Sequence, residues 1–318
     1  MTGTVYKSTG SWYQIKADDG KFYKCRIKGK FRIKGIKSTN PVAVGDRVVF
    51  KLEDPQDEEQ NGVISAIKDR DNYIIRKSVN LSKQTHIIAS NIDQAFLLVT
   101  LNNPPTFTTF IDRFLVTAEA YEIKAILLFN KIDAYSPEEL DEVKYLAAMY
   151  RQIGYQCIGI SAKTGKNIEQ VKELMQDKTS MISGHSGTGK STLVNAIEPK
   201  LDLKTTQISE QSRQGQHTTT FAEMFDLDFG ARIIDTPGIK GFGVVDIEKE
   251  ELGDYFPEFF TLKQDCKFNN CLHIDEPQCA VKDALEAGEI PWSRYKSYLQ
   301  ILKGEDGQQY RMDNYDQE

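Results

Sequence analysis

The pattern of apolar and polar positions in the first quarter of the chain is that of short strands. Apolar-rich stretches lie between Gly and polar turns, with no convincing helical pattern. The five predicted strands are Gly3–Tyr6, Trp12–Lys16, Phe22–Ile27, Val48–Leu52 and Gly62–Ile67. Five short strands in succession indicate a small closed barrel, for which the oligonucleotide-binding (OB) type is a good candidate.

The pattern changes from about Asn91, where continuous apolar runs begin to alternate with helical periodicity. The predicted strands are Ala95–Val99, Ala125–Phe129, Cys157–Ile160, Ser180–Ile182 and Ala231–Ile234. Helical patterns cover Thr109–Tyr121, Glu138–Arg151 and Ile168–Met175. Apolar strands separated by helices are typical of a mostly parallel α/β sheet that is covered on both faces.

The segment after about Gly241 contains a cysteine cluster and then a helical tail. Helical patterns are predicted for Ala280–Ala287 and Trp292–Leu302. Trp292, Tyr295, Tyr298 and Leu299 recur at helical spacing, and we expect them to pack against the domain that contains the cysteine cluster; direct contact with RNA is the alternative. The chain is therefore predicted to have three domains, at residues 1–75, 76–240 and 241–318.

The composition is that of an ordinary globular protein, with 318 residues of which 40% are hydrophobic and 27% charged. We find no apolar run long enough to span a bilayer and no signal-peptide core near Met1, so a cytoplasmic address without a membrane partner is expected. Nothing in the sequence demands a dimer, and a monomer is predicted.

The formal net charge of −6 hides an uneven distribution. Residues 1–80 carry sixteen Lys and Arg against ten Asp and Glu, a net of +6. Within them, one basic residue stands at every second position: Lys24, Arg26, Lys28, Lys30, Arg32 and Lys34. Such alternation places these charges on one face wherever the chain is extended, which predicts a polyanion-binding face; a solvated strand face is the plainer alternative.

A phosphate-binding loop is indicated between the strand that ends at Ser183 and a helical pattern over Thr192–Ile197. The segment Gly184-His185-Ser186-Gly187-Thr188-Gly189-Lys190-Ser191 matches G-x-x-x-x-G-K-[ST], and Thr192 follows it. In this motif backbone N–H groups cradle the phosphates, Lys190 reaches the β and γ phosphates, and the Ser191 hydroxyl binds Mg²⁺.

Two further segments are predicted to complete the phosphate site. Asp235-Thr236-Pro237-Gly238 ends a strand, so Asp235 is placed to hold the magnesium shell and the Gly238 N–H to sense the γ-phosphate. Between the two motifs lies a run of threonines, of which Thr219 is favoured as a magnesium ligand. Its neighbours Thr218 and Thr220 remain alternatives.

Base recognition is predicted at the ends of two earlier strands. Asn130-Lys131-Ile132-Asp133 follows one, and Ser161-Ala162-Lys163 follows the next. The Asp133 carboxylate can accept two hydrogen bonds from guanine, whereas adenine offers no such pair, which disfavours an ATPase. Asn130 can brace the neighbouring loops, the Lys131 stem can lie over the base, and the Ser161–Lys163 backbone can donate to guanine O6.

The cysteine cluster has the spacing and the chemistry of a metal site. Cys266, Cys271, His273 and Cys279 offer three thiols and one imidazole within fourteen residues. This set suits one tetrahedral Zn²⁺ with every position filled by protein, and therefore a structural role. A reduced, metal-free cluster is the alternative. Cys25 and Cys157 lie in apolar strand contexts and are expected to be buried thiols.

The order of the motifs identifies a resemblance. Regulatory GTPases have the phosphate loop first and Asn-Lys-x-Asp and Ser-Ala-Lys last, whereas here the last two come first. This order, the basic barrel, the cysteine cluster and Gly215-Gln216-His217-Thr218-Thr219 together resemble the RsgA or YjeQ family of circularly permuted bacterial GTPases. The resemblance covers essentially the whole chain.

The resemblance implies an activity, partners and a catalytic residue. It implies hydrolysis of GTP to GDP and phosphate that is gated by the small ribosomal subunit, in late maturation of that subunit, with rRNA as the polyanion. Ile239 stands where many GTPases have a water-orienting Gln, and the resemblance points to His217 instead. An exposed loop histidine without a catalytic role is the alternative, as is a nucleotide-regulated RNA-binding protein in which turnover hardly matters.

The permutation also leads to a hypothesis about domain movement. The segment after Gly238 runs directly into the cysteine domain, so the state of the γ-phosphate could reposition that domain as a two-state switch.

Overall fold

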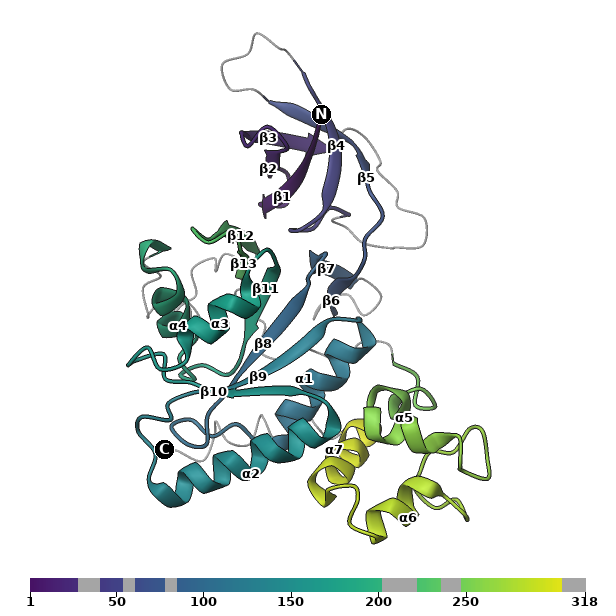
Figure 1. The fold of residues 1–318 in the computed structure, drawn as a ribbon. Coiled ribbons are helices and arrows are strands. Elements are labelled where there is room, and N and C mark those ends of the chain that lie inside the picture. Colours follow the sequence, from purple (N-terminus) through teal and green to yellow (C-terminus); the bar gives the residue numbers. More distant parts are fainter. Residues whose placement is uncertain (28–40, 54–60, 78–84, 202–221, 236–246, 305–318) are drawn as a thin grey trace, which may run out of the picture.

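The computed structural model describes residues 1–27, 41–53, 61–77, 85–201, 222–235 and 247–304 (Figure 1). A small barrel at the top of the view is followed by a central sheet with helices on both faces, and a helical segment lies beside the lower part of the sheet. In the part of the chain that is described, no helix is both long and apolar enough to cross a membrane. Seven predicted site residues lie outside the described ranges: Lys28, Lys30, Arg32, Lys34, His217, Thr219 and Gly238.

The predicted five-stranded barrel is confirmed. Its strands are β1 (Thr2–Ser8), β2 (Tyr13–Ala17), β3 (Phe22–Ile27), β4 (Arg47–Leu52) and β5 (Gly62–Ile67). They are ordered β1-β2-β3-β5-β4, and pairing of β1 with β4 closes the sheet. Alternate residues of β2 point inward, since Tyr13, Ile15 and Ala17 are buried while Gln14 is exposed. This order and closure are those of an OB-type barrel.

The predicted parallel α/β sheet is confirmed as well. The order is β10-β9-β8-β11-β13-β12, in which neighbours up to β13 run parallel and β12 is antiparallel. The strands are β8 (Gln94–Val99), β9 (Lys124–Phe129), β10 (Gln156–Gly159), β11 (Thr179–Ser183), β12 (Glu223–Asp226) and β13 (Arg232–Asp235). The helices that accompany them are α1 (Thr108–Ala120), α2 (Pro137–Ile153), α3 (Ile168–Met175) and α4 (Lys190–Ile197), followed by the short helix η1 (Pro199–Leu201).

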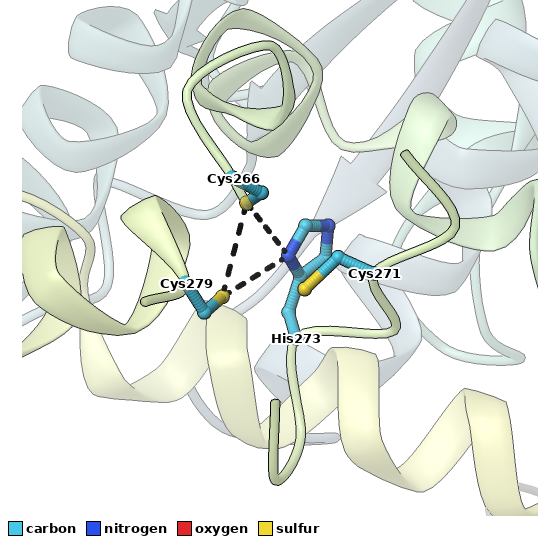
Figure 2. A group of neighbouring side chains, drawn as sticks. All are labelled: Cys266, Cys271, His273 and Cys279. Atoms are coloured by element: carbon cyan, nitrogen blue, oxygen red, sulfur yellow. Dashed lines mark hydrogen bonds between the residues drawn. The ribbon is translucent and has the colours of Figure 1, made fainter. Parts of the chain in front are cut away.

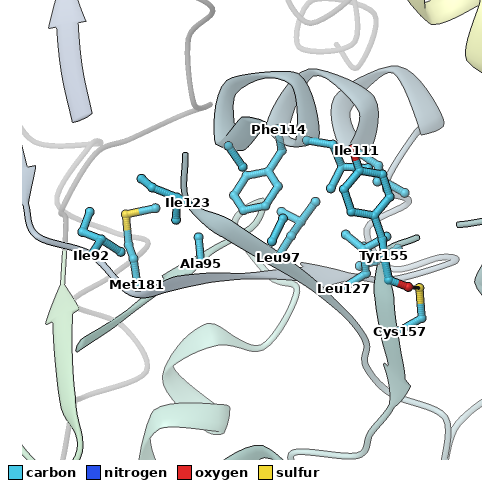
Figure 3. Packing of buried hydrophobic residues seen from close by; sticks show 14 of the residues in the cluster. Ile92, Ala95, Leu97, Ile111, Phe114, Ile123, Leu127, Tyr155, Cys157 and Met181 are labelled. Carbon is cyan, nitrogen blue, oxygen red and sulfur yellow. Dashed lines mark hydrogen bonds between the residues drawn. The ribbon is translucent and has the colours of Figure 1, made fainter. Parts of the chain in front are cut away.

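The two faces of this sheet are buried by different helices. On one face, Ile111 and Phe114 of α1 pack over Ala95, Leu97 and Leu127 of β8 and β9 (Figure 3). On the other face, the alternate residues of the same strands meet α3 and α4; this set comprises Phe96, Leu98, Ile126, Leu128, Val171 and Leu193. Because both faces are covered, β8 is buried over its whole length, as its continuous apolar sequence predicts.

The barrel and the α/β sheet form one continuous sheet through a pairing of β1 with β12. Lys7 pairs with Glu223 in register, and its ammonium group lies 2.8 Å from the Glu223 carboxylate. Tyr6 donates to Asp226 at 2.6 Å, and Lys16 forms an ion pair with the same carboxylate. Sequence analysis did not predict this connection, nor the hairpin of β6 (Tyr73–Lys77) and β7 (Thr85–Ser90).

A buried ion pair lies where the barrel meets this hairpin. Asp46 is fully buried, and its carboxylate accepts from the Arg70 guanidinium at 2.6 and 2.7 Å. The same carboxylate accepts from the Ser90 hydroxyl at 2.6 Å and from the Ala43 N–H at 2.8 Å. Asp46 therefore connects the β3–β4 side of the barrel to the chain on both sides of the hairpin.

The C-terminal segment is helical, as predicted. It contains η2 (Leu252–Tyr255), α5 (Pro257–Lys263), α6 (Ala280–Glu286) and α7 (Trp292–Lys303). Tyr295 and Tyr298 pack in its core as expected, but Trp292 does not, because 63% of its surface is exposed. The expectation for Trp292 was therefore wrong. The charged Arg294 of the same helix is instead completely buried, between α1 and α5.

We predict that Asp46→Ala lowers the free energy of unfolding by roughly 3–5 kcal/mol, because it leaves the buried Arg70 charge unpaired. Denaturant titration measures this. Asp141→Ala is the matched control, because its ion pair with Lys144 is 74% exposed on both sides and should leave the midpoint unchanged. Equal stability of Asp46→Ala and the parent would contradict the role assigned to the buried pair.

Candidate nucleotide and metal sites

The predicted nucleotide-binding motifs meet at one edge of the α/β sheet. Asn130 follows β9, Ser161 lies just beyond β10, Gly184 follows β11, and Asp235 is the last residue of β13. These strands are parallel, so their carboxyl ends face the same side, where ligands of open α/β sheets bind. The chain order of the motifs does not affect this convergence.

The phosphate loop joins β11 to the N-terminus of α4. Gly189 has a φ of +100°, and a Cβ atom on it would lie 2.5 Å from the Asn130 side chain. Glycine is therefore required there by both conformation and space. Ser186 and Gly187 are exposed at the mouth of the loop, whereas Thr188 and Ser191 are buried; Thr192, in the first turn of α4, is half-buried. Backbone N–H groups and the positive end of α4 thus offer a site for an anion.

Lys190 is held in place by the loop itself. Its ammonium group donates to the carbonyls of Gly184 and His185, each at 2.7 Å. Burial lowers the pKa of Lys190 to about 8, while the negative charge of Asp235 acts in the opposite direction. A partly desolvated cation with two carbonyl partners at the base of the loop is suited to an exchange of these partners for phosphate oxygens.

Asn130 connects two loops that are far apart in the sequence. Its side chain is 2% exposed; the amide donates to the Thr188 carbonyl at 2.8 Å and accepts from the Ala162 N–H at 3.0 Å. The phosphate loop and the Ser161–Lys163 segment are thereby fixed relative to each other. These two hydrogen bonds have the geometry needed for Asn130 to brace the neighbouring loops, which is the function that the sequence suggested.

Asp133, the residue predicted to recognise the base, is exposed, and its lowered pKa favours the ionised carboxylate. A hydrogen bond from Ser161 is the largest cause that lowers the pKa of Asp133, and Lys163 and Lys131 lower it further. The Ser161 hydroxyl also accepts from the Thr164 N–H at 3.1 Å, which fixes its orientation. A fixed carboxylate of this kind can accept from two adjacent N–H groups of a base.

The sequence did not indicate a loop that contacts both the phosphate loop and the Asn130–Asp133 segment. The segment 101–107 connects β8 to α1, and its Asn103 carbonyl accepts from Lys131, which also donates to the Gly187 carbonyl at 2.8 Å. Pro104 lies over Gly187, at 3.2 Å from the position of a Cβ atom there. These contacts involve backbone carbonyls and a proline ring. Neither requires a particular sequence motif, so the sequence alone does not indicate them.

The four predicted metal ligands converge in the C-terminal segment (Figure 2). Cys266, Cys271, His273 and Cys279 are all buried, and their ligand atoms lie within 4.8 Å of one another. Neighbouring atoms are 3.3 Å (His273 Nδ1 to Cys279 Sγ), 3.7 Å (His273 Nδ1 to Cys266 Sγ) and 4.0 Å (Cys266 Sγ to Cys279 Sγ) apart. Zinc–sulfur bonds of 2.3 Å in a tetrahedron would place ligand atoms about 3.8 Å apart, so the donor set fits a metal ion.

The backbone around this cluster is fixed by buried hydrogen bonds. The Tyr295 hydroxyl donates to the His273 carbonyl at 2.6 Å, and the Tyr298 hydroxyl donates to the Leu272 carbonyl at 2.7 Å. The Glu276 carboxylate accepts from the N–H groups of Leu272 and Ile274, each at 2.8 Å. All five cysteines are free thiols, and Cys25 and Cys157 are buried in the sheets, as expected.

The basic face of the barrel is described only at its start. Lys24 and Arg26 are both exposed on one side of β3, which agrees with their predicted alternation. The Lys24 ammonium lies 4.7 Å from the centre of the Trp12 ring, and Arg26 forms an ion pair of 2.7 Å with Glu53. The other four basic residues are outside the described part of the chain.

The fold and the motif arrangement define a class: a P-loop GTPase whose motifs occur in circularly permuted order. Two solved structures of that class are similar over nearly the whole chain. One is YjeQ from Thermotoga maritima, with 36% identity, a TM-score of 0.76, and coverage of 95% of this chain and 97% of that one. The other is YloQ, described as a circularly permuted GTPase, with 32% identity, a TM-score of 0.73, and coverage of 95% and 94%.

Family models and curated relatives agree with this class. The RsgA GTPase model matches residues 67–245, and the RsgA N-terminal domain model matches residues 2–64. "Small ribosomal subunit biogenesis GTPase RsgA" of Christiangramia forsetii is 77% identical over 99% of both chains. The protein of the same name from Bacteroides fragilis is 54% identical over 98% of this chain and 99% of its own length. The chain belongs to the RsgA GTPase family.

For the base site we predict that Asp133→Asn weakens GTP binding by about 10²- to 10⁴-fold, because two charge-assisted hydrogen bonds are lost. Affinity for xanthosine triphosphate should rise in the same variant, since xanthine presents an acceptor where guanine presents its amine. Titration of the parent and the variant with both nucleotides measures this change in base preference. Asp141→Asn on the exposed face of α2 is the control, and unchanged GTP affinity of Asp133→Asn would contradict the assignment.

Proposed function

We propose that this GTPase hydrolyses GTP under the control of the small ribosomal subunit and acts in late maturation of that subunit. The observation that carries the proposal is the convergence of four motifs at one sheet edge, in a chain 77% identical to a protein named as a small ribosomal subunit biogenesis GTPase. The partners would be GTP, GDP and the rRNA of the subunit. We further propose a cytoplasmic monomer with domains at 1–75, 76–240 and 241–318; strand β6 spans the first boundary.

In the proposed site, residues from both halves of the permuted chain bind GTP. The phosphates lie in the loop Gly184–Lys190, with Lys190 moved from its carbonyl partners to the β and γ phosphates. The guanine base lies between the Lys131 stem and the Ser161–Lys163 backbone, and Asp133 accepts from it. The Asn130 bridge keeps these subsites at a fixed separation.

Magnesium and water complete the proposed reaction. The hydroxyl of Ser191 and the carboxylate of Asp235 are suitable oxygen donors for Mg²⁺, with Thr219 as a third ligand in the GTP form. Mg²⁺ supplies charge neutralisation at the transferred phosphoryl group. Gly238 would donate its N–H to the γ-phosphate, and His217 would orient the attacking water, since Ile239 cannot hydrogen-bond to it.

The Cys/His cluster is proposed to hold one structural zinc ion. Three thiolates and the Nδ1 atom of His273 would fill its coordination sphere, so no position remains for a substrate. The cluster lies within a segment with few long helices, where a metal can replace part of an apolar core. The exposed Lys24 and Arg26, with the remaining basic residues of 24–34, are proposed to contact rRNA phosphates.

We predict that purified small ribosomal subunits raise the steady-state rate of GTP hydrolysis, whereas large subunits do not. His217→Ala should lower the stimulated rate by about 10²-fold and leave GTP affinity unchanged, because it removes water positioning and not binding. Phosphate release assays with both subunits measure this. Equal stimulation by both subunits, or none, would contradict the proposed partner; full activity of His217→Ala would contradict only the catalytic assignment.

A second prediction concerns the metal. Cys271→Ser should lose the bound zinc and make residues 247–304 sensitive to protease, since metal binding and folding of this segment are coupled. Native mass spectrometry and limited proteolysis measure the two effects. Cys157→Ser is the matched control, because this buried thiol lies in β10, away from the cluster. A protease-resistant segment after complete removal of zinc would contradict the structural role.

A further inference from the structure

An aromatic contact joins the phosphate loop to helix α1. The imidazole of His185 lies on the ring of Phe110, with ring centroids 3.8 Å apart and an interplanar angle of 31°. His185 is part of the cradle, because its carbonyl accepts from Lys190 at 2.7 Å and from the Thr188 hydroxyl at 2.9 Å. Burial, and then the charge of Lys190, lower the pKa of His185 and favour the neutral ring. A displacement of Phe110 would therefore also displace His185 and the loop backbone that would enclose the phosphates.

The same turn of α1 is fixed from its other side by the C-terminal helix. Thr109 donates to the Gln300 side chain at 2.8 Å, and Asp112 accepts from the Arg294 guanidinium at 2.7 Å. Both Gln300 and Arg294 belong to α7, which also packs against the Cys/His cluster through Tyr295 and Tyr298. Residues 109 to 112 thus contact the phosphate loop on one side and the C-terminal segment on the other.

The charged part of this contact is buried completely. Asp112 and Arg294 are each 0% exposed, and Tyr150 of α2 donates to the same Asp112 oxygen at 2.8 Å. Arg294 also binds Glu258 of α5 at 2.7 Å and lies 4.5 Å from the centre of the Phe256 ring. Burial alone would lower the pKa of Arg294, but Asp112 and Glu258 raise it overall, so the guanidinium stays charged. Such a group tolerates little displacement of its partners, because an unpaired buried charge is costly.

We propose that Phe110 is a positioning residue for the phosphate loop, and that the C-terminal segment sets the position of Phe110 through Arg294 and Asp112. Helical hydrogen bonds make residues 109–112 move as one unit, so a shift of Asp112 also displaces the ring that supports His185. The C-terminal segment then contributes to nucleotide affinity without contact with the nucleotide. This inference rests on the proposed function, in that it requires guanine nucleotide to bind at this loop.

The first test is the affinity of the full-length, zinc-loaded chain for fluorescent GDP. Phe110→Leu keeps an apolar side chain but loses the ring contact, and we expect binding about 3- to 10-fold weaker. Phe110→Tyr keeps the ring and should restore the parent affinity. In turnover, Phe110→Leu should raise KM for GTP and leave kcat unchanged, because it acts on ground-state and transition-state binding alike.

The second test asks whether Arg294 acts through Phe110. Arg294→Met should weaken GDP binding by a similar factor, and the double variant Phe110→Leu/Arg294→Met should bind no more weakly than the weaker single variant. Thr109→Val, which removes only the hydrogen bond to Gln300, replaces Arg294→Met if that variant does not fold. Val281→Ala is the control: Val281 is buried in the same C-terminal core but is on α6, and its GDP affinity should equal that of the parent.

Three results would overturn the inference while the proposed function stands. They are parent-like GDP binding by Phe110→Leu, effects of Phe110→Leu and Arg294→Met that multiply in the double variant, and a loss in Val281→Ala as large as that in Arg294→Met. Failure of the parent chain itself to bind GDP would overturn the proposed function, and this inference with it.

Discussion

The side chain of Asn130 holds together the loops that are predicted to bind the nucleotide. One amide joins the loop after β11 to the loop after β10, and it does so from the end of β9. Each bond joins the Asn130 side chain to a backbone group in the loop that follows another strand, so neither depends on how the strands are connected. This independence is the physical reason why the motifs can occur in permuted order and still form one site. It also explains why Gly189 must lack a side chain, since the Asn130 amide occupies the space where one would lie.

Local signals in the sequence predicted most of the fold and the recognisable part of the site. Runs such as Ala95–Val99 have enough apolar residues to identify a strand that is covered on both faces, and the glycine pattern of Gly184–Gly189 identifies the phosphate loop. Pairing between distant elements has no such signal. The β1–β12 pairing, for example, brings together residues that are 216 positions apart in the sequence.

Arg294 and Trp292 were the hardest residues to place from sequence, for opposite reasons. Helical spacing predicted that Trp292 packs against the C-terminal domain, yet most of its surface is exposed, whereas the charged Arg294 is completely buried. Charged residues are almost never fully buried unless they are paired. The partners of Arg294 are Asp112, 182 positions away, and Glu258 on another helix, so only the tertiary structure reveals that the pairing exists. A pattern of polarity alone cannot indicate a buried ion pair whose members come from separate elements.

This ion pair also limits how the C-terminal segment can respond to nucleotide. The permutation suggested that the γ-phosphate repositions this segment as a switch, because the chain passes directly from the Asp235 motif into it. Rotation of the segment away from α1 would separate Arg294 from Asp112 and break the hydrogen bond of Thr109 to Gln300, which costs free energy unless new contacts replace them. A ligand can supply that amount only through a matching difference in affinity for the two arrangements. Because α1 belongs to the fixed frame of the sheet, the buried pair favours the same placement in both nucleotide states. Strand β12 contacts the barrel through ion pairs that are partly exposed to solvent, and such pairs cost less to break than the buried pair of Arg294 and Asp112.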